Sequence, residues 1–195
     1  PPPVPDIAPT GLSKDTISIL GRRRSTRRVA GAAHFLNEEE LARFDYGDVH
    51  RILREVPGVY TRDEDGVGLR PNIGIRGASS DRSAKLALME DGILFGPAPY
   101  SAPAAYYFPL MNRVTGVEVF KGPASIRNGP NTIGGAINFV SRPVPTATLG
   151  SFDAAFGLNK AMKLHGYAGT AGSNWGVLLE GIHLSNDGFR NLDGG

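Results

Sequence analysis

Apolar and polar residues alternate with different periods along the chain, and these periods predict where helices and strands form. Asn37, followed by three glutamates, predicts an N-cap and an acidic first turn for a helix that ends near residue 44. Apolar residues at three- and four-residue spacing predict a second helix over about residues 48–56. Pro57-Gly58 ends that helix, because neither residue continues it.

After Gly58 the pattern changes to short apolar runs separated by Gly, Asp, Asn and Pro, which is typical of strands. Asp91-Gly92 stands between two such runs and favours a type I′ hairpin turn, because both positions of that turn need positive φ. Helices followed by strands indicate an α+β domain. Strands are predicted near residues 73–76, 86–89, 114–120 and 136–140.

Beyond Pro145 the chain divides into three units of strand length, over about residues 148–157, 160–171 and 175–185. Apolar and polar residues alternate only partly within them. A strand of a transmembrane barrel gives a weak signal of this kind. The chain ends in turn-type residues soon after the third unit and begins with Pro, so we expect it to be a truncated piece of a longer protein.

Composition narrows the class of protein. The 195 residues include 26 Gly and 15 Pro, which favours turns and tight loops over a helical bundle. No Cys is present, so disulfides, Cys zinc sites and thiol nucleophiles are excluded. No apolar run approaches the about 20 residues of a membrane helix.

The first 34 residues are rich in Pro and Arg and predict an extended linker. Its arginines carry the excess positive charge of a chain whose net charge is +2. They lack aromatic neighbours on which bases could stack, so a solvated tether is favoured over a nucleic-acid patch and no nucleic-acid partner is expected. Within the linker, polar and apolar residues alternate as in a lone strand over Asp15, Thr16, Ile17, Ser18 and Ile19.

The sequence contains no recognisable catalytic centre. The glycine-rich stretches lack both G-x-G-x-x-G and the Gly-Lys-Ser/Thr of a phosphate loop, and no G-x-S-x-G is present. Residues 63–66 resemble part of a calcium loop, but Gly74 stands where a bidentate carboxylate is required. The four histidines are dispersed. We therefore expect a protein that is not an enzyme and has no metal site and no cofactor.

Several short motifs follow one another in order from the end of the second predicted helix. They are residues 56–59 (VPGV), 70–77 (RPNIGIRG), 88–93 (LMEDGI), 117–126 (VEVFKGPASI), 129–130 (GP) and 134–140 (GGAINFV). This series resembles the plug domain of TonB-dependent outer-membrane receptors. Within that family the chain is most similar to the ferric-citrate type, because of residues 97–103 (PAPYSAP) and 106–109 (YYFP).

The resemblance implies a division into three parts: a linker over residues 1–34, a plug domain over 35–143 and the first strands of a barrel over 144–195. The implied fold class is an α+β plug followed by the first antiparallel strands of a transmembrane β-barrel that is incomplete here. In the family the plug fills a barrel of about 22 strands. A short box before the plug pairs with the energy-coupling protein TonB, and residues 15–19 lie where that box is expected.

The resemblance also implies roles for individual cations. Arg76 and Lys121 match positions at which plug cations face carboxylates of the barrel wall, and those carboxylates are expected beyond Gly195. Family plugs often carry Arg at the position of Lys121, whose point charge lacks the planar fork of Arg. The alternative reading of both is a solvated turn residue.

A second set of residues is expected near the external mouth, where positive charge attracts an anionic ferric chelate and tyrosines add hydroxyl donors. For each residue alone, loop solvation or packing is an equally good reading. The set is Arg62, Arg70, Arg82, Lys85, Tyr100, Tyr106 and Tyr107.

The sequence thus predicts a receptor that imports a ferric chelate, ferric citrate or another siderophore, across the outer membrane of a Gram-negative bacterium. Its partners are TonB with its inner-membrane complex, the ferric ligand and outer-membrane lipid, and its N-terminus lies in the periplasm. The alternatives are a receptor of the same family for a vitamin or glycan, a signal-transducing member with an extra N-terminal domain, and a soluble α+β binding module or enzyme.

Overall fold

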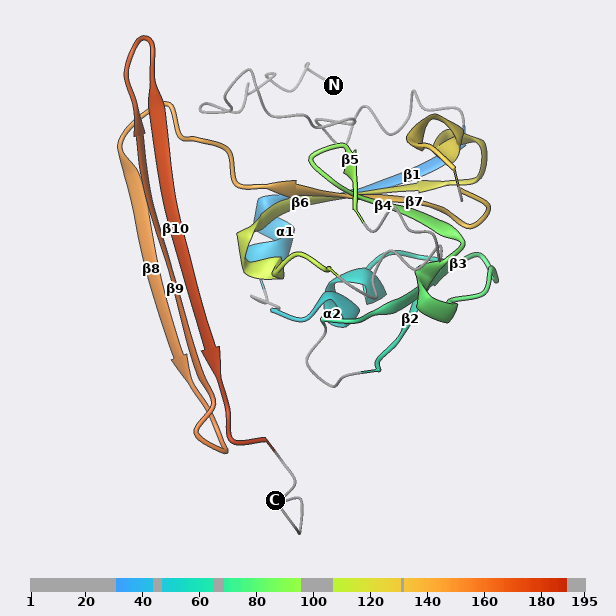
Figure 1. The fold of residues 1–195 in the computed structure, drawn as a ribbon, viewed down its shortest axis with the longest axis horizontal. Helices are drawn as coiled ribbons and strands as arrows, with labels where there is room; N and C mark the ends of the chain where they lie inside the picture. The colour runs from blue at the N-terminus through green and yellow to red at the C-terminus, as the bar shows by residue number, and fades with distance from the viewer. Residues whose placement is uncertain (1–30, 44–46, 65–68, 96–106, 131, 189–195) are drawn as a thin grey trace, which may run out of the picture. The chain divides into compact units, whose positions relative to one another are not determined.

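The computed structural model describes residues 31–43, 47–64, 69–95, 107–130 and 132–188 (Figure 1). The described chain divides into two compact units at the bond between Arg142 and Pro143. The first unit is an α+β domain, and the second is an antiparallel sheet.

The first unit is built on a five-stranded sheet with the strand order β1-β6-β7-β4-β5. Its parallel pair is β4 with β7, and the other neighbours are antiparallel. A second, two-stranded sheet of β2 and β3 lies beside it. The strands are β1 (Ala32–Leu36), β2 (Val59–Arg62), β3 (Asn72–Ile75), β4 (Leu86–Glu90), β5 (Ile93–Leu94), β6 (Val114–Lys121) and β7 (Gly135–Ser141).

Both α-helices of the described chain begin at a capping residue, and the first of these is the N-cap that the sequence predicts. Asn37 caps α1 (Glu38–Ala42): its Oδ1 accepts from the Glu40 N–H at 2.8 Å, and the Glu40 carboxylate accepts from the Asn37 N–H at 3.1 Å. Asp48 caps α2 (Val49–Arg54) through the N–H of His50. Short 3₁₀ helices complete the unit: η2 (Asp81–Ser83), η4 (Met111–Arg113) and η5 (Gly122–Asn128).

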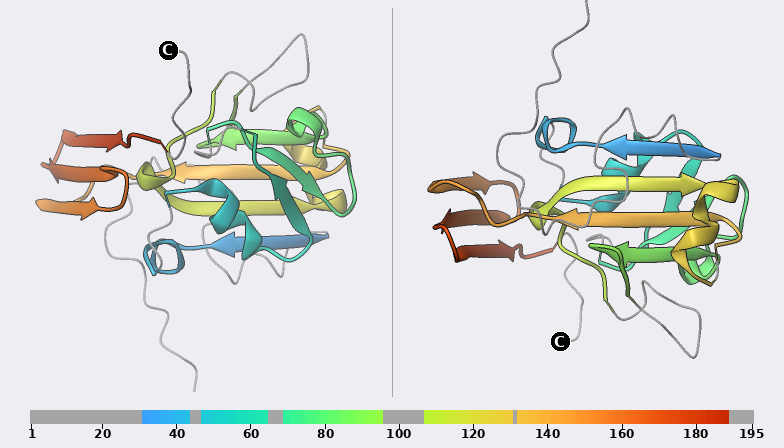
Figure 2. Two further views of the ribbon diagram at one scale, coloured as in Figure 1. Left: turned by 90° about the horizontal axis from the view of Figure 1, so that it is seen from below. Right: turned by 90° about the horizontal axis from the view of Figure 1, so that it is seen from above.

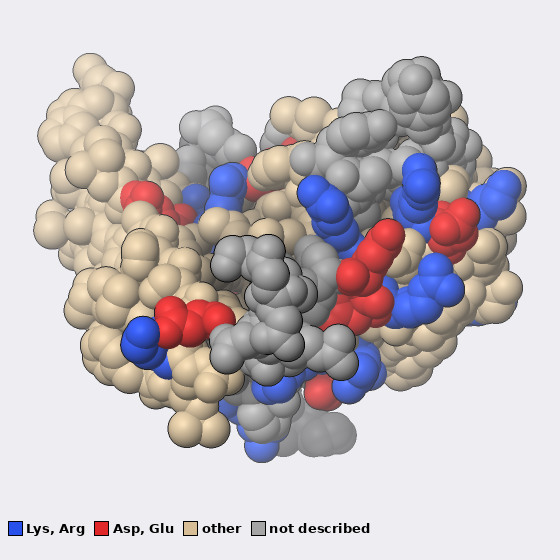
Figure 3. Space-filling view, turned by 60° about the horizontal axis from the view of Figure 1, so that its bottom comes forward, with Lys and Arg blue, Asp and Glu red and all other residues tan. Residues whose placement is uncertain are grey.

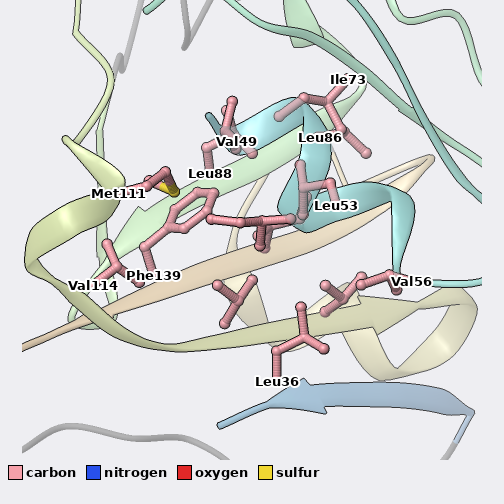
Figure 4. Close-up of a cluster of buried hydrophobic side chains, with 14 of the residues drawn as sticks. Leu36, Val49, Leu53, Val56, Ile73, Leu86, Leu88, Met111, Val114 and Phe139 are labelled. Carbon is pink, nitrogen blue, oxygen red and sulfur yellow. The ribbon is translucent and has the colours of Figure 1, made fainter. Parts of the chain in front are cut away.

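The main core lies between one face of the five-stranded sheet and α2 (Figure 4). Leu86, Leu88 and Phe139 reach it from the sheet, and Val49 and Leu53 reach it from α2. Ile73 and Ile75 of β3 close it at one side. The left view of Figure 2 shows α2 and the β2–β3 pair in front of this face.

The opposite face of the same sheet holds a second cluster of apolar residues, with Phe120 and Met89 packed among alanines. Two polar side chains, Glu118 and Asn138, are buried on this face at paired positions of β6 and β7. At one end of the face, Ala124 of η5 joins the cluster.

The turn between β4 and β5 has the predicted geometry, with φ of 50° at Asp91 and 78° at Gly92. Asn138 Oδ1 accepts from the Gly92 N–H at 2.8 Å, and the Asp91 carboxylate accepts from the backbone and the hydroxyl of Ser141. The turn is therefore tied to β7 at the point where the first unit ends.

The second unit consists of β8 (Leu149–Phe156), β9 (Met162–Ala171) and β10 (Gly176–Ser185), with β9 in the middle. Side chains alternate between its two faces because the register is regular over all three strands. One face carries Asp153, His165 and Glu180, whereas the other carries the exposed side chains of Phe152 and Leu179. No helix within the described ranges has both the length and the apolar character to span a membrane.

The structure confirms the predicted helices and strands and adds two strands that the pattern did not predict, β1 and β2. The first helix is shorter than expected, because it ends at Ala42 with Arg43 as its C-cap.

Candidate functional site

Arg76 and Lys121, the two cations expected to pair with a barrel wall, lie close together at one end of the first unit. Arg76 follows β3 with φ of 52°, and its Nη1 lies 3.2 Å from the position that a Cβ on Gly122 would take. The Arg76 N–H donates to the Gly58 carbonyl at 2.9 Å, and Lys121 Nζ donates to the carbonyl of Pro57. The Pro57-Gly58 turn therefore binds the backbone of Arg76 and the ammonium group of Lys121.

Lys121 is buried, with 7% of its surface exposed, whereas Arg76 is exposed. Burial, and then the charge of Arg76, lower the pKa of Lys121 below its ordinary value. Within the described part of the chain, neither cation forms an ion pair with a carboxylate. Two neighbouring cations that form no ion pair within the described chain favour an anionic partner.

The three arginines expected to bind ligand lie near one buried residue, Asn72. Arg62 pairs with Asn72 across the β2–β3 ladder, and Arg70 precedes Asn72 by two residues. Asn72 Oδ1 accepts from the N–H of Arg82 at 2.7 Å, and its Nδ2 donates to Glu64 at 2.9 Å. Asn72 therefore joins the β2–β3 hairpin to η2.

Ser83 makes a second connection between η2 and β3. Its buried hydroxyl accepts from the Ile73 N–H at 3.0 Å and donates to the Pro71 carbonyl at 2.9 Å. Both Arg82 and Ser83 have positive φ, at 48° and 55°. The side chains of Asn72 and Ser83 hold this tight turn in place, and with it the backbone of Arg82.

Lys85 and Tyr107 lie at opposite ends of β4. Lys85 precedes the strand, and its carbonyl accepts from the Gly134 N–H at 2.9 Å. The Tyr107 hydroxyl donates to Glu90, the last residue of β4, at 2.6 Å. Five strand residues separate the two ends by about 17 Å.

Glu90 is the hydrogen-bond acceptor of Tyr107. Its carboxylate also pairs with Arg113 of η4, and the Tyr107 ring meets the edge of Phe95 with centroids 5.6 Å apart. Burial, followed by the hydrogen bond to Glu90, raises the pKa of Tyr107 above its ordinary value. The hydroxyl is thus hydrogen-bonded within the first unit, while 44% of the residue stays exposed.

The remaining expected site residues lie outside the described residues. These are the TonB-binding residues Asp15, Thr16, Ile17, Ser18 and Ile19, and the tyrosines Tyr100 and Tyr106.

Sequence reasoning did not identify Asn72, Ser83 or Glu90, which position the expected site residues. Asn72 and Glu90 lie inside the motifs at residues 70–77 and 88–93, and this position was the sequence signal that could have identified them.

Charged side chains of the two signs are mixed in the view of Figure 3 and form no uniform basic patch there. His50 is buried in α2 with its Nε2 3.5 Å from Asp63 Oδ1. Within the described ranges, His, Asp and Glu side chains come together nowhere in a group of three or more that could hold a metal ion.

A model of the family described as the TonB-dependent Receptor Plug Domain matches residues 25–136. The match covers more than half of the chain, which therefore belongs to this family of receptor domains.

Solved structures share the fold. The ferric citrate transporter FecA in its unliganded form matches with a TM-score of 0.68 and 23% identity, over 85% of this chain and 27% of FecA. The ferric yersiniabactin uptake receptor FyuA from Yersinia pestis matches with a TM-score of 0.61 and 19% identity, over 77% of this chain and 23% of FyuA. The siderophore receptor PirA from Acinetobacter baumannii matches with a TM-score of 0.53 and 20% identity, over 74% of this chain and 22% of PirA. The chain thus spans about a quarter of the length of these proteins.

Proposed function

We propose that this chain is part of a TonB-dependent outer-membrane receptor that imports a ferric chelate, with ferric citrate as the first candidate. The observation that carries the proposal is the plug domain of residues 25–136 followed by strands of membrane-spanning length. The shared fold with a ferric citrate transporter and two siderophore receptors supports the class of cargo.

The three strands after the plug support a place in the outer membrane. Strands β9 and β10 have ten residues each, which is the length of a tilted membrane strand. One face exposes Phe152, Phe156 and Leu179, which suits lipid, and the other carries Asp153 and Glu180, which suits a polar lumen. In this proposal residues 144–195 begin the barrel that encloses a plug over residues 35–143.

The cation pair of Arg76 and Lys121 is proposed to hold the plug against carboxylates of the barrel wall. Both cations lie at one end of the plug, and the ion pairs that the described chain contains do not include them. A wall carboxylate would also offset the cost of burying Lys121.

The arginines around Asn72 are proposed to attract and hold the anionic chelate. Arg62, Arg70 and Arg82 are exposed, and the backbone N–H of Arg82 is held by the side chain of Asn72. Lys85, Tyr100, Tyr106 and Tyr107 remain further candidates for ligand contact, and of these Tyr107 already donates its hydroxyl to Glu90.

TonB is proposed to bind residues 15–19 by strand addition, in which backbone hydrogen bonds supply the affinity. The linker of residues 1–34 then lies in the periplasm, where it can transmit force to the plug.

The test is uptake of radiolabelled iron supplied as citrate, in cells that lack their own ferric-citrate receptor and express the full-length gene, with and without TonB. We expect uptake that requires TonB. Uptake without TonB would contradict the mechanism. Correct membrane insertion without citrate uptake would redirect the search to other siderophores, vitamins or glycans.

A matched pair of variants tests the arginine cluster. Arg82→Gln removes a charge at the proposed ligand site, whereas Arg54→Gln removes an exposed charge from the end of α2. The proposal expects a weaker apparent affinity for ferric citrate only in the first. Equal affinities for both variants would remove Arg82 from the site.

A further inference from the structure

Arg82 and Ser83 occupy the two central positions of a tight turn that has a left-handed backbone. Their φ angles are 48° and 55°. The Ala84 N–H donates to the Asp81 carbonyl at 3.0 Å, which closes the turn, and η2 with this turn lies beside β3 (Figure 1). Two consecutive positive φ angles mark a type I′ turn, in which Gly, Asn and Asp dominate because other side chains crowd the backbone.

The other pairs of consecutive left-handed residues in the described ranges contain a residue that tolerates this conformation. They are Arg76-Gly77, Asp91-Gly92 and Asn159-Lys160. Arg82-Ser83 has neither Gly, Asn nor Asp at its two positions. This turn therefore carries a backbone cost that the residues of the other three pairs reduce.

The packing of the first unit explains why Ser83 accepts this cost, but it does not explain Arg82. Ser83 is fully buried, and its hydroxyl bridges the Ile73 N–H and the Pro71 carbonyl, so Gly in its place would lose both hydrogen bonds. Arg82 is exposed. Within the ranges that the structure describes, its side chain forms no hydrogen bond and no ion pair.

A buried side chain fixes the backbone of Arg82. Asn72 is 2% exposed, and its Oδ1 accepts from the Arg82 N–H at 2.7 Å. The other end of the same amide donates to Glu64 at 2.9 Å, so the orientation of Asn72 is itself fixed. Backbone strain that the surrounding structure imposes in this way is characteristic of binding and active sites.

We propose that the strained turn at residues 82–83 serves to position Arg82 for a carboxylate of the ligand, with Asn72 as its positioning residue. This inference rests on the proposed import of a ferric chelate. A planar guanidinium binds both oxygens of a carboxylate, the group by which citrate offers negative charge. Arg62 pairs with Asn72 across the β2–β3 ladder, and Arg70 precedes Asn72 by two residues, so further positive charge lies on neighbouring segments.

The first test measures the strain without any ligand. Protection against hydrogen exchange is compared over residues 72–84 of the purified full-length receptor. We expect Arg82→Gly to exchange at least about twofold more slowly than the parent, because Gly adopts a left-handed backbone without crowding. Asp81→Gly is the matched control: this exposed neighbour is outside the left-handed set, and Gly there should speed exchange. Unchanged or faster exchange in Arg82→Gly would overturn the inference.

The second test measures binding of ferric citrate to the same proteins. We expect Arg82→Gly to weaken the affinity at least about tenfold while it strengthens the turn. A residue with only a structural role would not change affinity and stability in opposite directions. Equal affinity in the parent and in Arg82→Gly would overturn the inference alone. No binding by the parent would instead refute ferric citrate as the cargo, and with it the role of Arg82 toward citrate.

The third test addresses Asn72 as a positioning residue. Asn72→Ala should weaken binding of ferric citrate in the parent and have no further effect when Arg82→Gly is already present. Asn72→Asp keeps the acceptor for the Arg82 N–H, so it should restore most of the affinity that Asn72→Ala loses. Additive losses, or a failure of Asn72→Asp to restore binding, would overturn this role. The Arg82→Gly measurements leave every buried residue intact, so they decide the inference even if Asn72→Ala does not fold.

Discussion

Tyr107 donates a 2.6 Å hydrogen bond to Glu90, which joins the exposed tyrosine to the end of a buried strand. The same carboxylate pairs with Arg113, so one side chain of β4 holds residues from two other segments. Tyr107 therefore contributes to the plug's own packing, whatever its role toward ligand.

Tyr107→Phe removes the hydroxyl but keeps the ring that packs edge-on against Phe95. We expect a loss of about 1 kcal/mol in the free energy of unfolding, because Glu90 loses one donor and retains Arg113. Thermal unfolding of the purified protein checks this. A loss of ligand affinity without any loss of stability would show instead that the hydroxyl acts mainly in binding.

Lys121→Met tests whether protonation of the buried Lys121 makes the stability of the protein depend on pH. Since the pKa of Lys121 is lowered in the folded state, the unfolded chain binds more protons between that lowered pKa and 10.5. The contribution of Lys121 to the free energy of unfolding therefore rises with pH through this window. Below the window, Lys121 destabilises the folded state most. We expect Lys121→Met to flatten the rise in the urea-unfolding midpoint as the pH increases toward 10.5.

A wall carboxylate facing Lys121, as proposed, would reverse that slope in the whole receptor. The ion pair would raise the pKa, and its stabilisation would be lost as the pH rises through the raised value. Comparing this chain with the full-length receptor over the same pH range distinguishes the two situations.

Ser83→Ala removes the hydroxyl that connects Ile73 N–H and the Pro71 carbonyl. Both backbone groups are then left without this partner in a buried place, so we expect a loss of about 1–3 kcal/mol. Ser79→Ala is the matched control, because that exposed hydroxyl accepts only a 3.3 Å bond from the Asp81 N–H. Equal midpoints of chemical unfolding for the two variants would contradict a structural role for Ser83.

Gly74→Ala places a methyl group where β3 has no room. The new Cβ would overlap the Tyr60 ring and lie 2.7 Å from the Ala78 carbonyl, to which the Tyr60 hydroxyl donates. We expect a loss of more than about 2 kcal/mol, or failure to fold. Gly47→Ala, whose Cβ would meet Asn112 at an ordinary 3.5 Å, should differ from the parent by less than about 1 kcal/mol in the same thermal measurement.

The sequence by itself determined the features that depend on neighbouring residues. Asn37 and Asp48 start helices because a cap needs only the next two or three N–H groups. Asp91-Gly92 makes the hairpin turn because positive φ is a property of those residues in any fold. The ordered motifs led to the family through resemblance, and the match over residues 25–136 confirms it.

Only the tertiary structure decided which distant residues meet. The short strands β1 and β2 form because distant partners, β6 and β3, offer them hydrogen bonds, and their own patterns are too brief to predict. Lys121 is buried against Pro57, 64 residues away, and Glu118 is enclosed because β1 and β7 flank β6. Burial and pairing of this kind depend on strand order, which local preferences do not encode. For this reason the sequence pattern alone did not show that Lys121 and Glu118 are buried.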